Sequence, residues 1–185
     1  LRLPLKILCP LNKRCKVLKK LIPLLALLAA PVFAKPVLTV YTYDSFAADW
    51  GPGPAVKKAF EADCNCELKL VALEDGGSLL NRLRMEGKNS KADVVLGLDN
   101  NLLEAATQTK LFAPAGIATD ALKVPGGWNN ETFVPFDYGW FAFVYDKTKL
   151  KNPPKSLKEL VESNEKWRVI YQDPRTSTPG LGLLL

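Results

Sequence analysis

The sequence predicts an α/β fold built on a parallel sheet with helices on both faces, and three observations support this prediction. From residue 37 onward, short β-branched and aromatic runs alternate with segments of helical periodicity. The strand-like runs are apolar along most of their length, as expected for a sheet that is covered on both sides. No internal repeat interrupts the alternation, and 185 residues, 48% of them hydrophobic, suffice for one domain and part of another.

The first expected strand is Val37–Tyr43, which is rich in β-branched and aromatic residues. The stretch GPGPAVKKAFEADC follows it and predicts a helix with Pro54 at its first position. Val56, Ala59 and Phe60 form the apolar face expected for this helix.

The second expected strand, Cys66–Leu73, alternates charged and apolar residues before it becomes wholly apolar. The segment EDGGSLLNRLRMEG then predicts a turn and a helix with Leu79, Leu80 and Leu83 on one side. A third buried strand is expected at Ala92–Asp99, and a short helix in NNLLEAATQTK.

The chain changes character after residue 135. Trp140–Tyr145 has the composition of a strand and the preceding PFDYG does not, which is typical of a crossover into a second lobe. A capping box begins a helix at Ser156, and WRVIYQDP predicts a further strand. The expected organisation is a first lobe at residues 35–135, followed by a hinge crossover and an incomplete second lobe at residues 136–185.

The first 34 residues carry seven basic groups and no acidic one. Two lysines precede the apolar run Leu21–Ala30, which is shorter than the about 20 residues needed to span a bilayer. Small residues in VFA suit a cleavage site after Ala34. We therefore expect a secretory signal peptide at residues 17–34 rather than an uncleaved anchor.

Residues 1–16 precede this signal, and the only methionine of the chain is Met85. We interpret residues 1–16 as an upstream extension translated by mistake, with Val17 as an alternative start. They are left out of the fold prediction.

The rest of the chain is nearly neutral, since 18 basic residues face 19 acidic ones there. A nucleic-acid partner is therefore not expected. In an oxidising compartment, Cys64 and Cys66 are expected to close a small disulfide at a helix end or to stay as two thiols. One Cys-x-Cys in a chain without histidine is a poor metal site, so neither metal nor cofactor is expected.

Four polar loops follow the expected strands, where ligands bind in open α/β sheets: YDSFAADWGPGP, EDGGS, LDNN and QDPRTSTPG. Asp75 and Gly76 offer a carboxylate and a close backbone approach to a ligand. Ser177 and Thr178 lie where the start of a helix would favour an anion. In both loops the alternative is a purely structural cap of the following helix.

Aromatic residues gather beside carboxylates in YTYDSFAADWG, which suits a flat cationic ligand. Tyr43, at the end of the first expected strand, is the better binding candidate, whereas Tyr41 is expected in the core. Catalysis has little support, because there is no histidine, and Ser177 has no activating base nearby in the sequence. We predict that the protein is not an enzyme.

Three segments of the sequence resemble a known family: KPVLTVYTYDSFAADWGPGPAVKKAFEADCNCELKLVALEDG, GWNNETFVPFDYGWFAFVYDK and WRVIYQDPRTSTPGLGLLL. They are similar to the periplasmic thiamine-binding proteins, the solute-binding components of bacterial thiamine ABC importers. The similarity covers residues 17–185. DPRTSTPG alone is less specific, because related ferric-iron and polyamine binders carry similar loops.

The resemblance implies a type II periplasmic solute-binding fold with two lobes, hinge strands and a buried ligand. It implies a monomer in the periplasm that delivers thiamine, or its mono- or diphosphate, to the membrane permease of the transporter. It also implies ligand contacts at Asp75, Gly76, Ser177 and Thr178, the last two towards the phosphate, and stacking of a ring on Tyr43.

Two other functions stay open. One is the binding of ferric iron or another small solute within the same superfamily, although EDGG and YTYDSFAADWG favour thiamine. The other is a secreted serine hydrolase that uses Ser177, which loss of ester hydrolysis in Ser177→Ala would support.

Members of the family continue past position 185, so the resemblance implies a truncated second lobe. We expect the 185-residue chain to be unstable or to aggregate alone and to bind thiamine poorly, because strand edges and apolar surface stay uncovered. Titration of the purified chain with thiamine, followed by tryptophan fluorescence, checks this expectation. Micromolar binding would contradict it.

Overall fold

The computed structural model describes residues 34–185, and every helix and strand given below lies in the compact unit Pro36–Leu185. The expected extension at residues 1–16 lies outside the described residues. So do Cys9, Cys15 and the expected signal peptide at residues 17–34, except for Ala34.

A parallel three-stranded sheet organises this unit. Its strands are β1 (Val37–Tyr43), β2 (Glu67–Leu73) and β3 (Val94–Val95), in the order β2-β1-β3. β1 and β2 pair along their whole lengths, while β3 lies opposite the middle of β1. The predicted first strand and all but one residue of the predicted second strand are confirmed.

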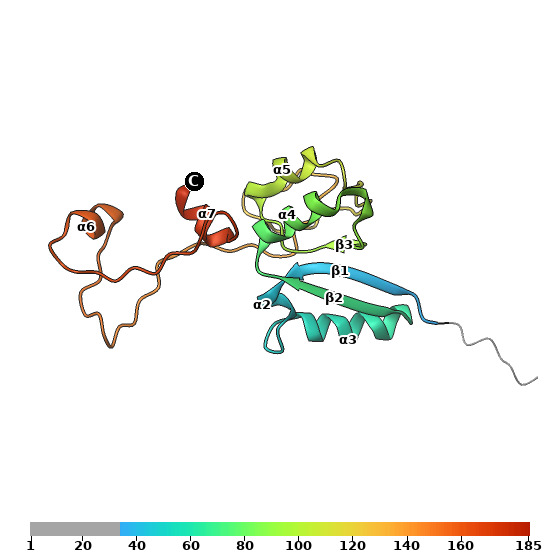
Figure 1. Cartoon of the computed structure of the whole chain (residues 1–185), viewed down its shortest axis with the longest axis horizontal. Helices are drawn as coiled ribbons and strands as arrows, with labels where there is room; N and C mark the ends of the chain where they lie inside the picture. Colours follow the sequence, from blue (N-terminus) through green and yellow to red (C-terminus); the bar gives the residue numbers. More distant parts are fainter. Residues whose placement is uncertain (1–33) are drawn as a thin grey trace, which may run out of the picture. The chain divides into compact units, whose positions relative to one another are not determined.

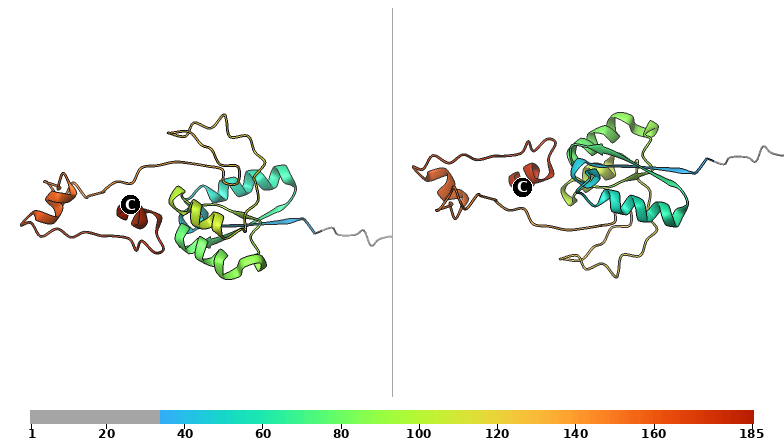
Figure 2. Two further views of the ribbon diagram at one scale, coloured as in Figure 1. Left: turned by 90° about the horizontal axis from the view of Figure 1, so that it is seen from above. Right: turned by 90° about the horizontal axis from the view of Figure 1, so that it is seen from below.

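Helices cover both faces of the sheet (Figures 1 and 2). On one face lie α2 (Asp44–Ala47) and α3 (Gly53–Cys64), which connect β1 to β2. On the other lies α4 (Gly76–Glu86), which leads through η1 (Gly87–Asn89) to β3. The later helical elements are η2 (Asn100–Leu102), α5 (Leu103–Gln108), α6 (Leu157–Glu162) and α7 (Thr178–Leu184).

The core lies between α4 and the sheet. Tyr41, Leu79 and Leu83 form its centre, and each is at most 4% exposed. Burying leucine side chains of this kind stabilises the fold by roughly 1.5–3 kcal/mol each. The predicted apolar side of α4 and the predicted core position of Tyr41 are therefore confirmed.

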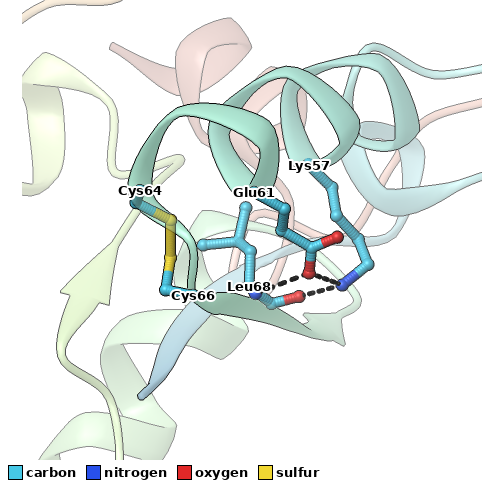
Figure 3. Close-up of a disulfide and its surroundings, with 5 residues drawn as sticks. All are labelled: Lys57, Glu61, Cys64, Cys66 and Leu68. Carbon is cyan, nitrogen blue, oxygen red and sulfur yellow. Dashed lines mark hydrogen bonds and ion pairs between the residues drawn. A yellow bond between two sulfur atoms is a disulfide. The ribbon is translucent and has the colours of Figure 1, made fainter. Parts of the chain in front are cut away.

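Helix α3 packs with a different side from the one that its apolar residues predict. Val56 and Phe60 are exposed, whereas Glu61 Oε1 accepts a hydrogen bond from the Leu68 amide at 2.7 Å. Lys57 Nζ donates to the Leu68 carbonyl (Figure 3). Because β2 is an edge strand, its outward-facing amide and carbonyl need partners, and polar side chains of α3 supply them.

A disulfide between Cys64 and Cys66 joins the end of α3 to the residue before β2 (Figure 3). Asn65 between them adopts a left-handed conformation (φ 50°, ψ 37°), which asparagine tolerates better than most residues. By lowering the entropy of the unfolded chain, a disulfide that closes a loop this short stabilises the folded state by about 1.5 kcal/mol. Of the two states expected from the sequence, the structure therefore has the disulfide.

The predicted strands of the last third of the chain do not form within residues 34–185. Trp140–Tyr145 and Arg168–Tyr171 lie outside regular strands and are largely exposed, because no described segment pairs with them. The predicted capping box of α6 is present, since Ser156 Oγ accepts from the Glu159 amide at 3.0 Å. No helix of residues 34–185 combines the length and apolarity needed to cross a bilayer.

Lys110 follows α5 with φ at +56°, a conformation that costs a residue with a Cβ atom roughly 1 kcal/mol. We expect Lys110→Gly to raise the free energy of unfolding by about 1 kcal/mol, measured by urea denaturation. Lys88→Gly is the matched control. Lys88 has a negative φ, so the added chain flexibility should lower stability there. Equal effects of the two substitutions would contradict the assignment of strain to Lys110.

Candidate functional site

Asp75 stands at the junction of β2 and α4, at the carboxyl end of the sheet. Its backbone is extended (φ −165°, ψ −176°), and its Oδ1 accepts a hydrogen bond from the Gly76 amide at 2.8 Å. The other oxygen, Oδ2, accepts from the Thr178 amide at 3.0 Å, although 103 residues separate the two in the chain. One carboxylate therefore joins the first turns of α4 and α7, where the helix dipoles favour negative charge.

Gly76 and Gly77 allow this close approach. A Cβ atom on Gly76 would lie 2.7 Å from the Gly97 carbonyl oxygen and 3.0 Å from Thr178 Oγ1. A Cβ atom on Gly77 would lie 2.9 Å from the carbonyl oxygens of Arg175 and Thr176. Only glycine leaves room for the 175–178 segment to pack against the start of α4.

Ser177 uses its hydroxyl within its own loop. Its Oγ accepts from the Gly180 amide at 3.3 Å and so caps α7, and it donates to Gln172 Oε1. The Thr178 hydroxyl, in contrast, has no hydrogen-bond partner among residues 34–185. The capping alternative is therefore realised for Ser177, and Thr178 keeps a free hydroxyl beside Asp75.

Tyr43 ends β1 and lies against the turn after β3. Its ring occupies the space that a Cβ atom on Gly97 would need, and Gly97 itself has φ at +113°. The ring contacts Phe46 edge-on at 5.9 Å between centroids. Burial raises the pKa of the Tyr43 phenol, and the negative charges of Asp137 and Asp75 raise this pKa further.

The structure thus brings four of the predicted residues to one end of the sheet: Tyr43, Asp75, Gly76 and Thr178. It also turns the fifth, Ser177, towards its own helix. Gly97 joins the four, and its signal was a glycine inside the strand predicted at Ala92–Asp99, since glycine in a strand often marks close backbone approach. The negative charge of Asp137 contributes to the raised pKa of Tyr43, and nothing in PFDYG predicted this effect.

Arg175 supplies no free positive charge to this site. Its guanidinium Nε donates to both oxygens of Asp173, at 2.9 and 3.1 Å, and this pairing lowers the pKa of Asp173 to about 2. A separate hollow of about 570 Å³ lies at the other end of α4, where Arg84, Lys88 and Lys110 stand near helix C-termini. Basic side chains are favoured there by the helix dipoles alone.

The hydrogen-bond partners of Ser177 bear on the serine-hydrolase alternative. Ser177 hydrogen-bonds to an amide side chain and a backbone amide, and neither can act as a general base. Within residues 34–185, no group of three or more histidine, cysteine or acidic side chains could hold a metal ion. In open α/β sheets, ligands bind beyond the carboxyl ends of the strands, which is where these polar loops lie.

Comparison with known families identifies the class. Residues 55–183 match the family described as bacterial extracellular solute-binding protein, and the chain belongs to this family. The α/β fold class predicted from the sequence is thereby confirmed, while the lobe boundaries stay a prediction.

The chain is also similar to individual proteins. The chain is 89% identical over 168 residues to the thiamine-binding periplasmic protein of Salmonella typhimurium, covering 91% of this chain and 51% of that protein. It is 57% identical over 158 residues to the thiamine-binding periplasmic protein of Brucella suis, covering 85% and 47%. It is also similar to a solved periplasmic thiamin binding protein (TM-score 0.79, 87% identity), covering 81% of this chain and 47% of that chain. The chain thus spans about half the length of these relatives.

Asp75→Ala should release the amide of Thr178, because that amide loses its acceptor. We expect hydrogen exchange at Thr178 to accelerate at least tenfold, and the free energy of unfolding to fall by about 1 kcal/mol through the lost cap of α4. Asp99→Ala is the control, since Asp99 caps η2 through the Asn101 amide. Unchanged exchange at Thr178 in Asp75→Ala would show that the carboxylate does not hold α7.

Proposed function

We propose that the protein is the thiamine-binding component of a bacterial ABC importer and works in the periplasm. The observation that carries this proposal is that Tyr43, Gly76 and Thr178 lie together with the carboxylate of Asp75 at one end of the sheet. The relatives of 57–89% identity named as thiamine-binding periplasmic proteins support the same ligand. The predicted organisation agrees with it: a signal peptide at residues 17–34, a first lobe at residues 35–135 and part of a second at residues 136–185.

Thiamine presents a positively charged thiazolium ring, an aminopyrimidine and a hydroxyethyl arm that can carry phosphate. An aromatic face next to carboxylates suits the cationic ring, so the proposed position of this ring is near Tyr43. The carboxylate of Asp75 has about four lone pairs that can accept hydrogen bonds, and two of them accept from backbone amides. It can therefore still accept a hydrogen bond from a ligand N–H group. Gly76 contributes indirectly, because its missing side chain lets Thr178 and Gly97 lie against the start of α4.

The phosphate of a thiamine ester would lie towards residues 177–178. The free Thr178 hydroxyl can donate to it without breaking an existing bond. The Ser177 hydroxyl would first have to leave Gln172, because a hydroxyl has one proton to donate. Within this proposal, Thr178 is therefore the stronger phosphate contact of the pair.

The remaining parts of the proposal concern partners and chemistry. The protein would act as a monomer that delivers its ligand to the membrane permease of the importer. It would have no nucleic-acid partner, no cofactor and no enzymatic activity. The bonding of Ser177 to Gln172 and Gly180, which leaves it without a base, supports the last point.

A hybrid protein tests the proposed function. This chain would be continued from residue 185 by the corresponding remainder of the Salmonella typhimurium relative, and its binding to thiamine measured by calorimetry. We expect saturable one-to-one binding that falls at least tenfold in Gly76→Ala, because the added methyl meets Gly97 and Thr178. Ala105→Gly on α5 is the control, since Ala105 lines the separate hollow with Arg84, Lys88 and Lys110 and should leave binding unchanged.

Two further experiments on the hybrid test the alternatives, iron binding and ester hydrolysis. Ferric citrate should compete with thiamine only if the site is an iron site. Hydrolysis of a simple ester should not depend on Ser177→Ala. Absence of thiamine binding by a folded hybrid would overturn the proposal.

A further inference from the structure

Phe46, on α2, contacts two other aromatic rings that come from distant parts of the chain. It packs edge-on against Tyr43 of the candidate site, with ring centroids 5.9 Å apart. It also packs edge-on against Phe136, with centroids 5.9 Å apart and ring planes at 89°. Phe136 is the first residue of the segment that the sequence assigns to the hinge crossover. A series of three rings therefore joins this crossover to the end of β1.

The backbone of Phe46 is held in one place by two glycines. A Cβ atom on Gly51 would lie 2.7 Å from the Phe46 carbonyl oxygen, and one on Gly53 would lie 2.5 Å from the same atom. Phe46 is also only 3% exposed. Because the backbone is packed this closely, a change in the surroundings of Phe46 is taken up by rotation of its side chain.

The ring of Tyr43 lies between a rigid neighbour and a movable one. The rigid neighbour is the backbone of Gly97, since the ring fills the space that a Cβ atom there would need. The movable neighbour is the ring of Phe46. The orientation of the Tyr43 ring therefore depends on where the Phe46 ring points.

Phe136 is the member of the series with the least support from the rest of the protein. It is 53% exposed, and within residues 34–185 its backbone makes no hydrogen bond. Its removal would therefore disturb the core little but would leave space beside Phe46. The Phe46 ring could turn into this space and give up its contact with Tyr43.

We propose that Phe136 is a positioning residue, which acts through Phe46 to hold the Tyr43 ring in the orientation that stacks on the ring of the ligand. This inference rests on the proposed function, because it concerns the ligand that stacks on Tyr43. It adds to that function a residue of the crossover segment that need not touch the ligand. Stacking depends on how two ring faces are oriented, so a tilted Tyr43 would bind the ligand more weakly.

The first test measures thiamine binding by calorimetry on the hybrid protein described above. We expect Phe136→Ala to weaken binding by roughly three- to tenfold, the range expected from one aromatic contact. Phe136→Tyr should restore most of the binding, because it keeps the ring and its hydroxyl can point into the hollow of about 330 Å³ that Phe136 lines. Phe133→Ala is the matched control, because Phe133 contacts Phe112 at 5.0 Å and has no ring contact with Phe46.

A double-mutant cycle separates positioning from a general loss of packing. In a Tyr43→Leu background, Phe136→Ala should change thiamine binding less than about twofold, because no aromatic ring is left to orient. Equal losses in the two backgrounds, or no loss with Phe136→Ala alone, would overturn the inference while leaving the proposed function intact. Failure of the unsubstituted hybrid to bind thiamine would overturn the proposed function and the inference with it.

A second measurement on the hybrid needs no ligand. The contribution of Tyr43 to the near-ultraviolet circular dichroism is the signal that Tyr43→Phe removes. This contribution should be smaller when Phe136→Ala is already present, because a ring that is held less firmly gives a weaker signal. It should keep its size in the presence of Phe133→Ala. An equal contribution with and without Phe136 would contradict the inference directly, whatever the affinity for thiamine.

Discussion

The hydrogen bonds of the Asp75 carboxylate are the interaction on which the rest of the site depends. The carboxylate takes one amide from the start of α4 and one from the start of α7, and it thereby fixes the position of a segment a hundred residues away. The partial positive charges of two helix starts compensate its charge. The glycines at positions 76 and 77 follow from this contact, because any side chain there would hold the two segments apart.

This geometry resolves the choice between a capping role and a ligand role for the polar loops. For a carboxylate the two roles are compatible, since capping leaves lone pairs available on Asp75. For a serine hydroxyl they compete, because Ser177 has already committed its single proton to Gln172. The same structural motif, a polar residue before a helix, thus leaves one side chain available to a ligand and restricts the other.

The sequence predicted β1, β2 and α4 closely because their patterns arise from local burial. Leu79 and Leu83 repeat with the helical period, and Val37–Tyr43 has the composition of a buried strand. The packing side of α3 could not be predicted in this way. Its orientation depends on the unpaired backbone groups of an edge strand, which Glu61 and Lys57 satisfy. Strand order decides which backbone amide needs a side-chain partner. The spacing of apolar residues in a sequence indicates helices and strands but not the order of the strands in a sheet.

Part of the candidate site could be predicted from the sequence for a similar reason. Loops after strands converge in any parallel sheet, so the positions of Tyr43 and Asp75 followed from the alternation of elements alone. The ring of Phe136 contacts Phe46, and a contact between residues 46 and 136 has no signature in one sequence. The expected strands at 140–145 and 168–171 have suitable compositions, but a strand also needs a neighbour to pair with.

The bridge between Cys64 and Cys66 has a consequence for the order of events during biogenesis. Its two sulfur atoms are brought together by a tripeptide, so this cross-link needs no distant part of the polypeptide to be present before it closes. Most covalent links between cysteines report that a domain has already assembled. This one can form before β1 and β2 have paired, because only three consecutive residues take part in it.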